Sequence, residues 1–461
     1  MKGPTKRPHT GTVTVSSPRM PPSRINRSIA IVEVLFCVYA FLYYTSFWWS
    51  ILGEQLGLVV GAIRYSILGF SVMMLCLRWK TLFRILPKGT WLWPLFILCV
   101  VSLAWSSFPE MSIEGIIRAI FQVAAFSLYF TSRFNPKHQL YVIAIALAIS
   151  ALGNLFYIVA MPSVGIHVGD KFSGAWRGYY SNKNEFSGFA LWALAVFYSL
   201  SSNESNRLIA NSTRIGLLVC SVLVILSTSK TALVLMFFVS LCLFVWQRYR
   251  WRGEKTILTL DIASMALLAM IGGIINSWVA LVTGLGKDPT MSGRTDIWTA
   301  TIIQVNQRPL FGYGFAGFWT EDNPAAQSIG DYLHEGFYTY NAHNGFLDIL
   351  IDSGWLGMLL FITGFLSTWA LALRYAYRPT SPGDCWPLAV MLLVTTYNMT
   401  ETSFMKDNLN WLFYVMVYLS MRIWPRSPSR VPSQPRIKPN YRTALASQTP
   451  LPNSSIRRTR L

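Results

Sequence analysis

Cationic and hydrogen-bonding residues gather in two segments of the chain, residues 173–184 and residues 292–348, which also hold many aromatic residues and glycines. Guanidinium groups bind phosphate or carboxylate oxygens through parallel N–H donors, and a neutral imidazole with an ordinary pKa of about 6.5 accepts protons well. These residue types are therefore suited to binding an anion and moving a proton. The candidate side chains are Arg177, Lys183, Arg294, Arg308 and His343.

Each candidate also has a simpler interpretation as a structural or solvated residue. Arg177 and Lys183, taken alone, would be ordinary loop charges. A single histidine such as His343 more often makes structural hydrogen bonds than catalyses a reaction. Arg294 and Arg308 are harder to explain in this way, because the segments predicted below to face the outside hold few cations.

Two further patterns lie close to the second group. Residues 312–317 spell G-x-G-x-x-G, but the dinucleotide-binding fingerprint requires a preceding strand in a βαβ unit, so we interpret these glycines as turn residues. A helix that begins near His343 would carry a polar stripe of Asn344, Asp348 and Asp352, which fits either a site or a surface that faces water. Neither pattern identifies a ligand by itself.

Apolar segments must position these candidates. Of the 461 residues, 53% are hydrophobic and only 13% are charged, which excludes a disordered chain, a disulfide-rich scaffold and an ordinary soluble enzyme. A bilayer core requires about 20 apolar residues per helix. The sequence therefore predicts an all-α polytopic membrane protein with about twelve transmembrane helices. The predicted spans are residues 29–49, 56–77, 90–108, 113–132, 139–161, 186–200, 215–229, 231–247, 257–282, 343–373, 386–400 and 408–424.

The distribution of positive charge orients these spans. With both termini in the cytoplasm, 29 of the 39 lysines and arginines fall in cytoplasmic segments, and joining 215–229 to 231–247 as one helix would invert everything that follows. The long outer segments are then 162–185 and 283–342, and the latter is a large loop before the tenth span. We expect both to be long loops without regular structure. Loops of that kind are usually functional.

The terminal segments 1–28 and 425–461 are basic and rich in proline and serine, so we predict disordered cytoplasmic tails. The net charge of +19 is concentrated there, where anionic lipid would attract it. We therefore expect membrane lipid as a partner of the tails, and no nucleic acid.

Three charged residues lie inside predicted spans. Glu33 is one turn from the cytoplasmic end of its span, so we expect its side chain to reach the surface. Arg64 and Arg118 lie in the outer halves of their spans, where a buried charge usually faces a cavity or a partner. They are candidates either for function or for structural ion pairs with Glu114 or Glu54.

The motifs occur in an order that resembles the O-antigen ligase and polymerase superfamily, especially its exopolysaccharide-production members. The resemblance covers roughly residues 30 to 424, and the ordered set is more specific than any single motif. One departure is Lys230, where Ser-Arg-Thr is often seen, which keeps the charge but loses bidentate pairing. The matching residues are Arg177 with Asn182-Lys183-Asn184, Ser229-Lys230-Thr231, Gly293 to Trp298, Arg308 to Gly314 and His343-Asn344-Gly345.

This resemblance implies a metal-independent glycosyltransferase of the bacterial inner membrane, without a cofactor. It would transfer a glycan from undecaprenyl pyrophosphate to an acceptor hydroxyl at the periplasmic face. A ligase would use lipid A core as acceptor, and a polymerase a growing glycan. The resemblance favours a polymerase, with a flippase and a chain-length regulator as partners.

The resemblance also implies roles for particular residues. Arg177 and Arg294 match positions that bind the donor pyrophosphate, and His343 would be the general base. We count Arg294 and His343 as catalytic. The other predicted substrate-binding residues are Lys183, Lys230, Arg308, Asn344, Arg64 and Arg118.

Two other functions remain open from the sequence. A twelve-span transporter of a small solute would show repeated halves and broken helices with polar sites at the membrane midplane. The sequence has no convincing repeat, and its motifs cluster in outer loops. A non-catalytic assembly component is the other alternative.

Overall fold

The computed structural model describes eight stretches of the chain. In these stretches the regular secondary structure is helical, apart from one isolated bridge between Ile166 and Trp176. Both predicted tails and the predicted span 257–282 lie outside the described residues. The described residues are 27–53, 56–169, 172–201, 204–248, 294–333, 338–376, 383–399 and 401–425.

Five described helices are long and apolar enough to cross a membrane, and a sixth candidate is a bent pair, Trp79–Gly89 and Leu92–Ala104, with an angle of 91°. A multi-span, all-helical membrane protein is therefore confirmed, whereas the number twelve remains a prediction. The five are α3 (Gly57–Leu77), the continuous helix Pro109–Arg133, α8 (Pro136–Ala160), α11 (Arg207–Leu226) and α16 (Gly345–Ala376).

Shorter apolar helices occupy most other predicted windows. The predicted pair 215–229 and 231–247 forms two separate helices, α11 and α12, joined at a turn in which Thr228 has a φ of 52°. The shorter helices are α1 (Arg27–Tyr44), α5 (Leu92–Val101), α10 (Lys183–Ser201), α12 (Lys230–Arg248), α17 (Trp386–Tyr397) and α18 (Leu409–Ile423).

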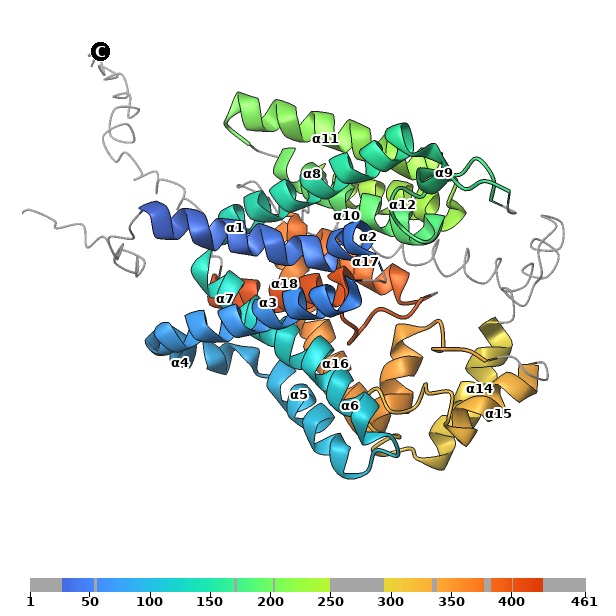
Figure 1. The fold of residues 1–461 in the computed structure, drawn as a ribbon. Coiled ribbons are helices and arrows are strands. Elements are labelled where there is room, and N and C mark those ends of the chain that lie inside the picture. Colours follow the sequence, from blue (N-terminus) through green and yellow to red (C-terminus); the bar gives the residue numbers. More distant parts are fainter. Residues whose placement is uncertain are drawn as a thin grey trace, which may run out of the picture. The chain divides into compact units, whose positions relative to one another are not determined.

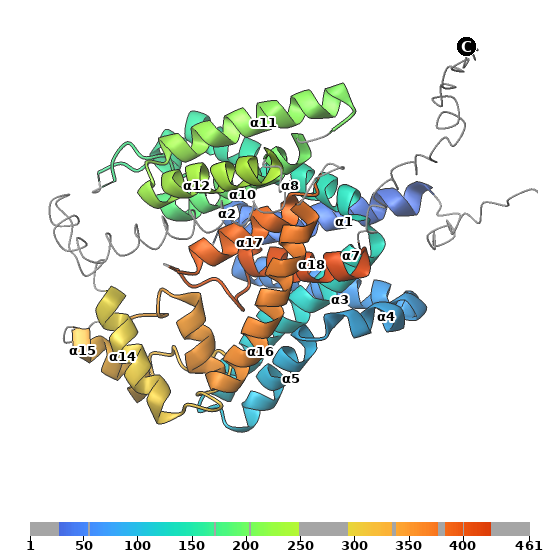
Figure 2. The same cartoon turned by 180° about the vertical axis from the view of Figure 1, so that it is seen from behind.

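The helices pack around an aromatic core. Helix α10 lies along α11 and also packs on α8, as both views show (Figures 1 and 2). Helix α18 packs against α7 (Val123–Arg133), where Trp411 and Phe126 are fully buried. Rings that meet edge to face, such as Phe41 with Phe126 at 5.3 Å between centroids, hold the helices in register.

The predicted span 29–49 is broken. Helix α1 ends at Tyr44, Ser46 has a φ of 58°, and a second helix, α2 (Phe47–Leu52), follows. The Thr45 carbonyl at the break accepts hydrogen bonds from the hydroxyls of Tyr179 and Tyr180, at 3.2 and 2.8 Å. The outer segment 162–185 therefore satisfies a backbone group that the helix break leaves open.

Helix α16 is also broken, at Gly354, whose φ of 63° is outside the helical region. Residues 309–314 dock into this break. Their backbone accepts from Trp355 N at 2.8 Å and Leu356 N at 3.2 Å, and donates to the carbonyls of Ile351 and Asp352 at 3.0 and 2.9 Å. A Cβ on Gly354 would meet the Leu310 backbone at 2.4 Å, so only glycine fits there.

The described part of the predicted loop 283–342 contains regular structure. It holds α14 (Arg294–Gln307) and α15 (Pro324–Leu333), which pack together. Their apolar faces share a small core with the first half of α16, in which Phe318 and Ile329 are fully buried. Our expectation of a loop without regular structure was wrong for this part.

The expectation that Glu33 reaches the surface was also wrong. Its side chain is only 1% exposed and pairs with the guanidinium of Arg78 and, at 2.7 Å, with that of Arg133. Two cations from neighbouring helices compensate the buried carboxylate, so it has no need to reach water.

Candidate functional site

Two of the predicted site residues meet at a carboxylate that the sequence analysis had not singled out. A terminal nitrogen of Arg294 lies 2.6 Å from Oε1 of Glu401, and Nδ1 of His343 lies 3.3 Å from Oε2 of the same residue. All three side chains are between 24% and 35% exposed. Residues more than a hundred positions apart thus form one accessible cluster, which we call the Glu401 cluster.

Local backbone geometry presents His343. Its φ of 48° is unusual for a residue with a side chain, and its N–H donates to the Asn341 side chain at 2.8 Å. Asn344 caps α16 by accepting from the N–H groups of Phe346 and Leu347 at 3.0 and 3.3 Å. The side-chain oxygen of Asn344, a predicted substrate-binding residue, is therefore engaged in holding the helix start.

Gly345 completes this motif. Its N–H donates to the Asn398 carbonyl at 2.9 Å, and a Cβ would meet the Asn398 side-chain oxygen at 2.0 Å. The close approach ties the start of α16 to the connection between α17 and α18, which carries Glu401. The sequence His-Asn-Gly thus supplies a displayed imidazole, a helix cap and a residue small enough for this contact.

Arg294 is the first residue of α14, and a contact from Trp298 holds α14 beside His343. Trp298, one turn further on, donates from its indole nitrogen to the Ala342 carbonyl at 2.9 Å. The Ala342 N–H in turn donates to Asp348 at 2.9 Å. The residue directly before His343 is therefore fixed from both sides.

The polar stripe of α16 faces inward. Asp348 and Asp352 are 2% and 5% exposed, so the interpretation as a water-facing surface was wrong. Asp348 accepts from the Trp319 indole at 3.1 Å and lies 3.6 Å from the ammonium of Lys406. These contacts fix the connection between α17 and α18 against α16.

Electrostatics favour an ionised carboxylate in the Glu401 cluster. Burial raises the pKa of Glu401, but the hydrogen bond from His343 and the charge of Arg294 outweigh it, so the pKa lies below its ordinary value. An ionised carboxylate at Nδ1 fixes the imidazole with its other nitrogen, Nε2, as proton acceptor. The cluster can therefore act as an oriented general base next to a guanidinium.

The other motif residues meet elsewhere, at the turn before α12. Lys183 lies 3.3 Å from the Thr228 hydroxyl and 3.5 Å from its carbonyl oxygen, and its ammonium lies over the Phe172 ring. Asn184 accepts from Ser229 at 3.2 Å. Lys230, the first residue of α12, is exposed beside them. We call Lys183, Lys230 and the turn 227–229 the lysine cluster.

Arg177 holds its own loop in place. Its Nε donates to the Val164 carbonyl at 2.8 Å, and a terminal nitrogen lies 3.4 Å from the Ser181 carbonyl. The preceding residue, Trp176, donates from its backbone to Leu226 at 3.0 Å. Arg177 therefore lies in the loop that is tied to the lysine cluster.

One residue links the two clusters. Tyr397, at the end of α17, lies within electrostatic range of Glu401 and Arg294 and also of Glu185. Glu185 accepts from Ser181 and Asn182, both at 3.0 Å, in the loop that carries Lys183. The start of α10 is therefore close to the end of α17.

Arg308, Arg64 and Arg118 lie in other surroundings. The Arg308 guanidinium stacks on Tyr313 at 4.7 Å from the ring centroid and borders a cavity of about 480 Å³ with Trp105. Arg64 and Arg118 both pair with Glu114, which agrees with the structural alternative, and both line a separate pocket. Glu54, the other proposed partner, lies outside the described residues.

The glycines of residues 312–317 make turns, as we interpreted them. Gly312 and Gly314 have φ values of 66° and 98°, and both approach other backbone or side-chain atoms too closely for a Cβ.

In the described ranges, no group of three or more His, Cys, Asp or Glu side chains is arranged to hold a metal ion.

Glu401 is the residue that sequence reasoning missed. It follows the predicted span 386–400 directly, but most acidic residues of the sequence lie in the predicted outer segments, so its position alone did not set it apart. Its two partners come from distant motifs, and only the fold brings them together.

Comparison with known proteins agrees with the motifs. Residues 215–362, which include Arg294, Arg308 and His343, match a protein-family model described as O-antigen ligase. The chain is also 24% identical over 285 residues to the exopolysaccharide production protein ExoQ of Rhizobium meliloti (strain 1021), in an alignment that covers 59% of this chain and 62% of the relative. The match thus spans less than two thirds of the relative's length. Residues 215–362 of this chain are therefore similar to the O-antigen ligase family, and the chain is similar over part of its length to ExoQ.

Proposed function

We propose that this chain is a membrane glycosyltransferase that transfers an oligosaccharide from undecaprenyl pyrophosphate to an acceptor hydroxyl at the periplasmic face. The acceptor oxygen forms a bond with the anomeric carbon of the donor sugar. The bond between that carbon and the phosphate oxygen breaks, and the lipid pyrophosphate leaves with the electron pair. The hydroxyl proton passes to Nε2 of His343, without a metal ion.

The Glu401 cluster is the observation that supports this proposal. Glu401 contacts Nδ1 of His343 and therefore leaves Nε2 for the acceptor hydroxyl. It also contacts one terminal nitrogen of Arg294. A guanidinium has five N–H donors, so Arg294 retains others for the phosphate on which charge builds as the bond breaks.

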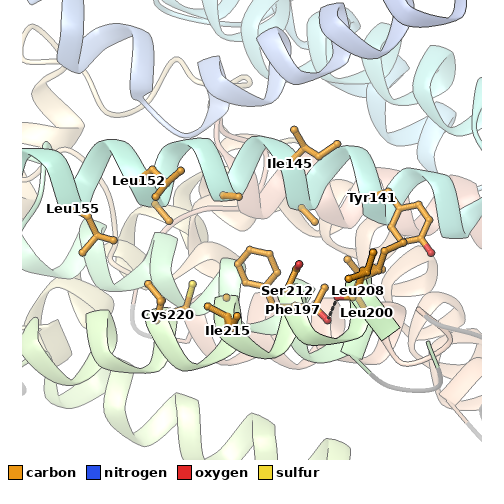
Figure 3. Close-up of a pocket in the computed structure, with 17 residues that line it drawn as sticks. Tyr141, Ile145, Leu152, Leu155, Phe197, Leu200, Leu208, Ser212, Ile215 and Cys220 are labelled. Carbon is orange, nitrogen blue, oxygen red and sulfur yellow. Dashed lines mark hydrogen bonds between the residues drawn. The ribbon is translucent and has the colours of Figure 1, made fainter. Parts of the chain in front are cut away.

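An apolar cavity beside the lysine cluster is suited to the lipid tail of the donor. It has a volume of about 660 Å³ and lies between α8, α10 and α11, and its lining includes Ile145, Leu152, Phe197 and Ile215 (Figure 3). Cys220 lies at one end of the lining, and α11 ends six residues later at Leu226, about 9 Å along the helix and directly before the turn of the lysine cluster. An isoprenoid in the cavity would thus have its pyrophosphate within reach of Lys183 and Lys230.

The proposal includes the number of membrane spans and the side of the membrane on which the termini lie. Twelve spans in the bacterial inner membrane, with both termini cytoplasmic, would expose both clusters to the periplasm. Cysteines introduced into residues 248–255 should be labelled only after the membrane is permeabilised. Labelling of these sites from outside intact cells would contradict the orientation.

Within this function we propose a polymerase, because the named relative is an exopolysaccharide production protein. A deletion strain should then accumulate single repeat units on the carrier and lose long polymer, which electrophoresis of extracted glycans would detect. Polymer of normal length that no longer reaches lipid A core would instead identify a ligase. In a reconstituted assay, loss of transfer with a chelator and recovery with a divalent cation would contradict the metal-free mechanism.

The break in α16 is the observation that favours a transporter as the second candidate, since transporters often bind solutes at broken helices. Asp348 and Asp352 lie next to this break and are buried. The docked segment 309–314, however, bonds to the backbone groups at the break, which are therefore not offered to a solute. Uptake of a labelled solute by vesicles that contain the purified protein would support the transporter instead.

A further inference from the structure

The pocket lined by Arg64 and Arg118 is polar and lies between α1, α3 and the connection that precedes α18. It has a volume of about 350 Å³. Its lining combines three charged side chains, Arg64, Arg118 and Asp407, with aromatic rings that include Tyr43 and Trp49. The proposed reaction at the Glu401 cluster does not use these residues.

Three polar atoms of this pocket are buried without a hydrogen-bond partner in the described structure: Nε of Arg64, Nε of Arg118 and Oδ1 of Asp407. The other carboxylate oxygen of Asp407 accepts from the Tyr43 hydroxyl at 2.6 Å. Two donors and one acceptor are thus unpaired in side chains that line the same pocket. Because such groups are unfavourable when buried and unpaired, a ligand toward which these side chains turn to form hydrogen bonds would be stabilised.

A π-helix carries Arg118. Residues Ile116–Gln122 form this wide helix inside the long helix Pro109–Arg133. The Trp411 indole donates to the Ala119 carbonyl at 2.8 Å, and Gln122 donates to the Tyr44 hydroxyl at 3.2 Å, so both sides of the wide turn are held. Such turns are rare and often occur at functional sites.

The open groups define the ligand chemistry. A bare anion would satisfy the arginines, but its charge would oppose the carboxylate of Asp407. A hydroxyl group both donates and accepts, so several hydroxyls on one ring can satisfy all three atoms. The apolar face of a sugar ring also suits Trp49, which is 49% exposed.

We propose that this pocket is a subsite for one sugar residue of the glycan substrate. Asp407 would accept from a sugar hydroxyl, and Arg64 and Arg118 would donate to ring or hydroxyl oxygens. The proposal rests on the proposed glycosyltransferase function and adds a position where the glycan is recognised. Asp407 and Glu401 lie on one connection, and the contact of Lys406 with Asp348 at 3.6 Å fixes it between them.

The test is saturation-transfer NMR on the full chain in lipid nanodiscs, with methyl glucoside, methyl galactoside and inorganic phosphate as probes. We expect signals from at least one glycoside with the wild type. Asp407→Asn should weaken that binding about tenfold, because one strong hydrogen bond to a charged group is lost. His343→Ala, which removes the proposed base, should bind the glycoside as the wild type does.

A second variant avoids changing a charge. Gly61 lines the pocket, and a Cβ there would have no atom within 4 Å, so Gly61→Leu should fill the cavity without disturbing the packing of α3. Gly69 on the same helix is equally open and lies outside the pocket lining, which makes Gly69→Leu the matched control. Only Gly61→Leu should abolish glycoside binding.

The outcomes separate this proposal from the proposed function. Absence of glycoside binding to the wild type, or equal binding by both leucine variants, would overturn the subsite. Binding of phosphate alone would identify an anion site and would also overturn it. Glycoside binding that follows these expectations in a protein without transferase activity would leave the subsite standing and remove the proposed function.

Discussion

The Glu401 cluster and the lysine cluster hold their charges in different ways. In the first, Arg294 and His343 contact the same carboxylate. In the second, Lys183 contacts a hydroxyl and a carbonyl oxygen of Thr228, which carry no formal charge. A carboxylate offsets part of the positive charge of the cation that it pairs with, whereas hydroxyl and carbonyl oxygens orient a cation through their dipoles.

This difference suggests a division of roles. The lysine cluster offers two ammonium groups near an apolar cavity, which suits binding of a lipid pyrophosphate. The Glu401 cluster offers an oriented imidazole, which suits proton transfer. Changes in the Glu401 cluster should therefore lower kcat, and changes in the lysine cluster should mainly raise KM for the donor.

The largest expected effect is that of His343→Ala. Removing the general base should lower the transfer rate by roughly 10²–10⁴-fold, whereas donor binding persists. The measurement is polymer formation in a deletion strain and in a reconstituted assay at matched protein levels. His138→Ala, at an exposed histidine of α8, is the control. Normal polymer from a well-expressed His343→Ala variant would remove His343 from the mechanism.

Arg294→Lys comes next. The charge is kept, but a lysine cannot contact Glu401 and a phosphate through a rigid fork, so we expect kcat to fall about 10–100-fold. Steady-state kinetics with purified donor would measure it. Arg214→Lys, at an exposed position of α11, should be silent. Equal activity of Arg294→Lys and wild type would show that charge alone suffices there.

Lys183→Ala and Lys230→Ala should have smaller effects. We expect KM for the donor to rise about 2–10-fold in each, with kcat nearly constant, because an exposed charge contributes modestly to binding. The increase in KM caused by each substitution should be larger at low salt, where charges are less screened. Lys80→Ala, at an exposed lysine that stacks on Trp79, is the control. A fall in kcat alone would reject the division of roles.

The smallest expected effect is on stability as a function of pH. The pKa of Glu401 is lowered in the folded protein from an ordinary value of 4.5, so its ion pair stabilises the fold above that value and stops doing so as the pH falls through the lower folded value. Wild type should therefore melt a few degrees above Glu401→Gln near neutral pH, by a rough estimate. That difference should shrink below about pH 4.5. A difference that grows on acidification would contradict the ion pair.

Hydropathy predicted the helices that depend on local composition. The window 56–77 corresponds closely to α3, Gly57–Leu77, because its apolar residues are contiguous. Hydropathy did not predict the interruptions at Thr45 and Gly354 or the π-helix that carries Arg118. Each of these depends on hydrogen bonds from a distant segment, such as those from Tyr180 to Thr45 and from Trp411 to the π-helix.

The site was predicted to a similar extent. Motif order selected Arg294 and His343 as candidates, since their types and spacing are a local property of the sequence, and in the structure both contact Glu401. It also selected Asn344 and Arg308, whose contacts in the structure are a helix cap and a stack on an aromatic ring. Glu401 was missed because a single carboxylate has no pattern, and its role arises only from the two partners that the fold places beside it.

The docking of residues 309–314 into α16 has a consequence for biogenesis. This segment is synthesised before α16, so it is already present when α16 enters the membrane. A straight α16 would keep its own hydrogen bonds, whereas the broken form must receive them from residues 309–314 or expose backbone groups to lipid. The backbone groups at the break are therefore satisfied only in a chain whose residues 309–314 lie beside Gly354, so the break couples the insertion of α16 to the placement of the segment before it.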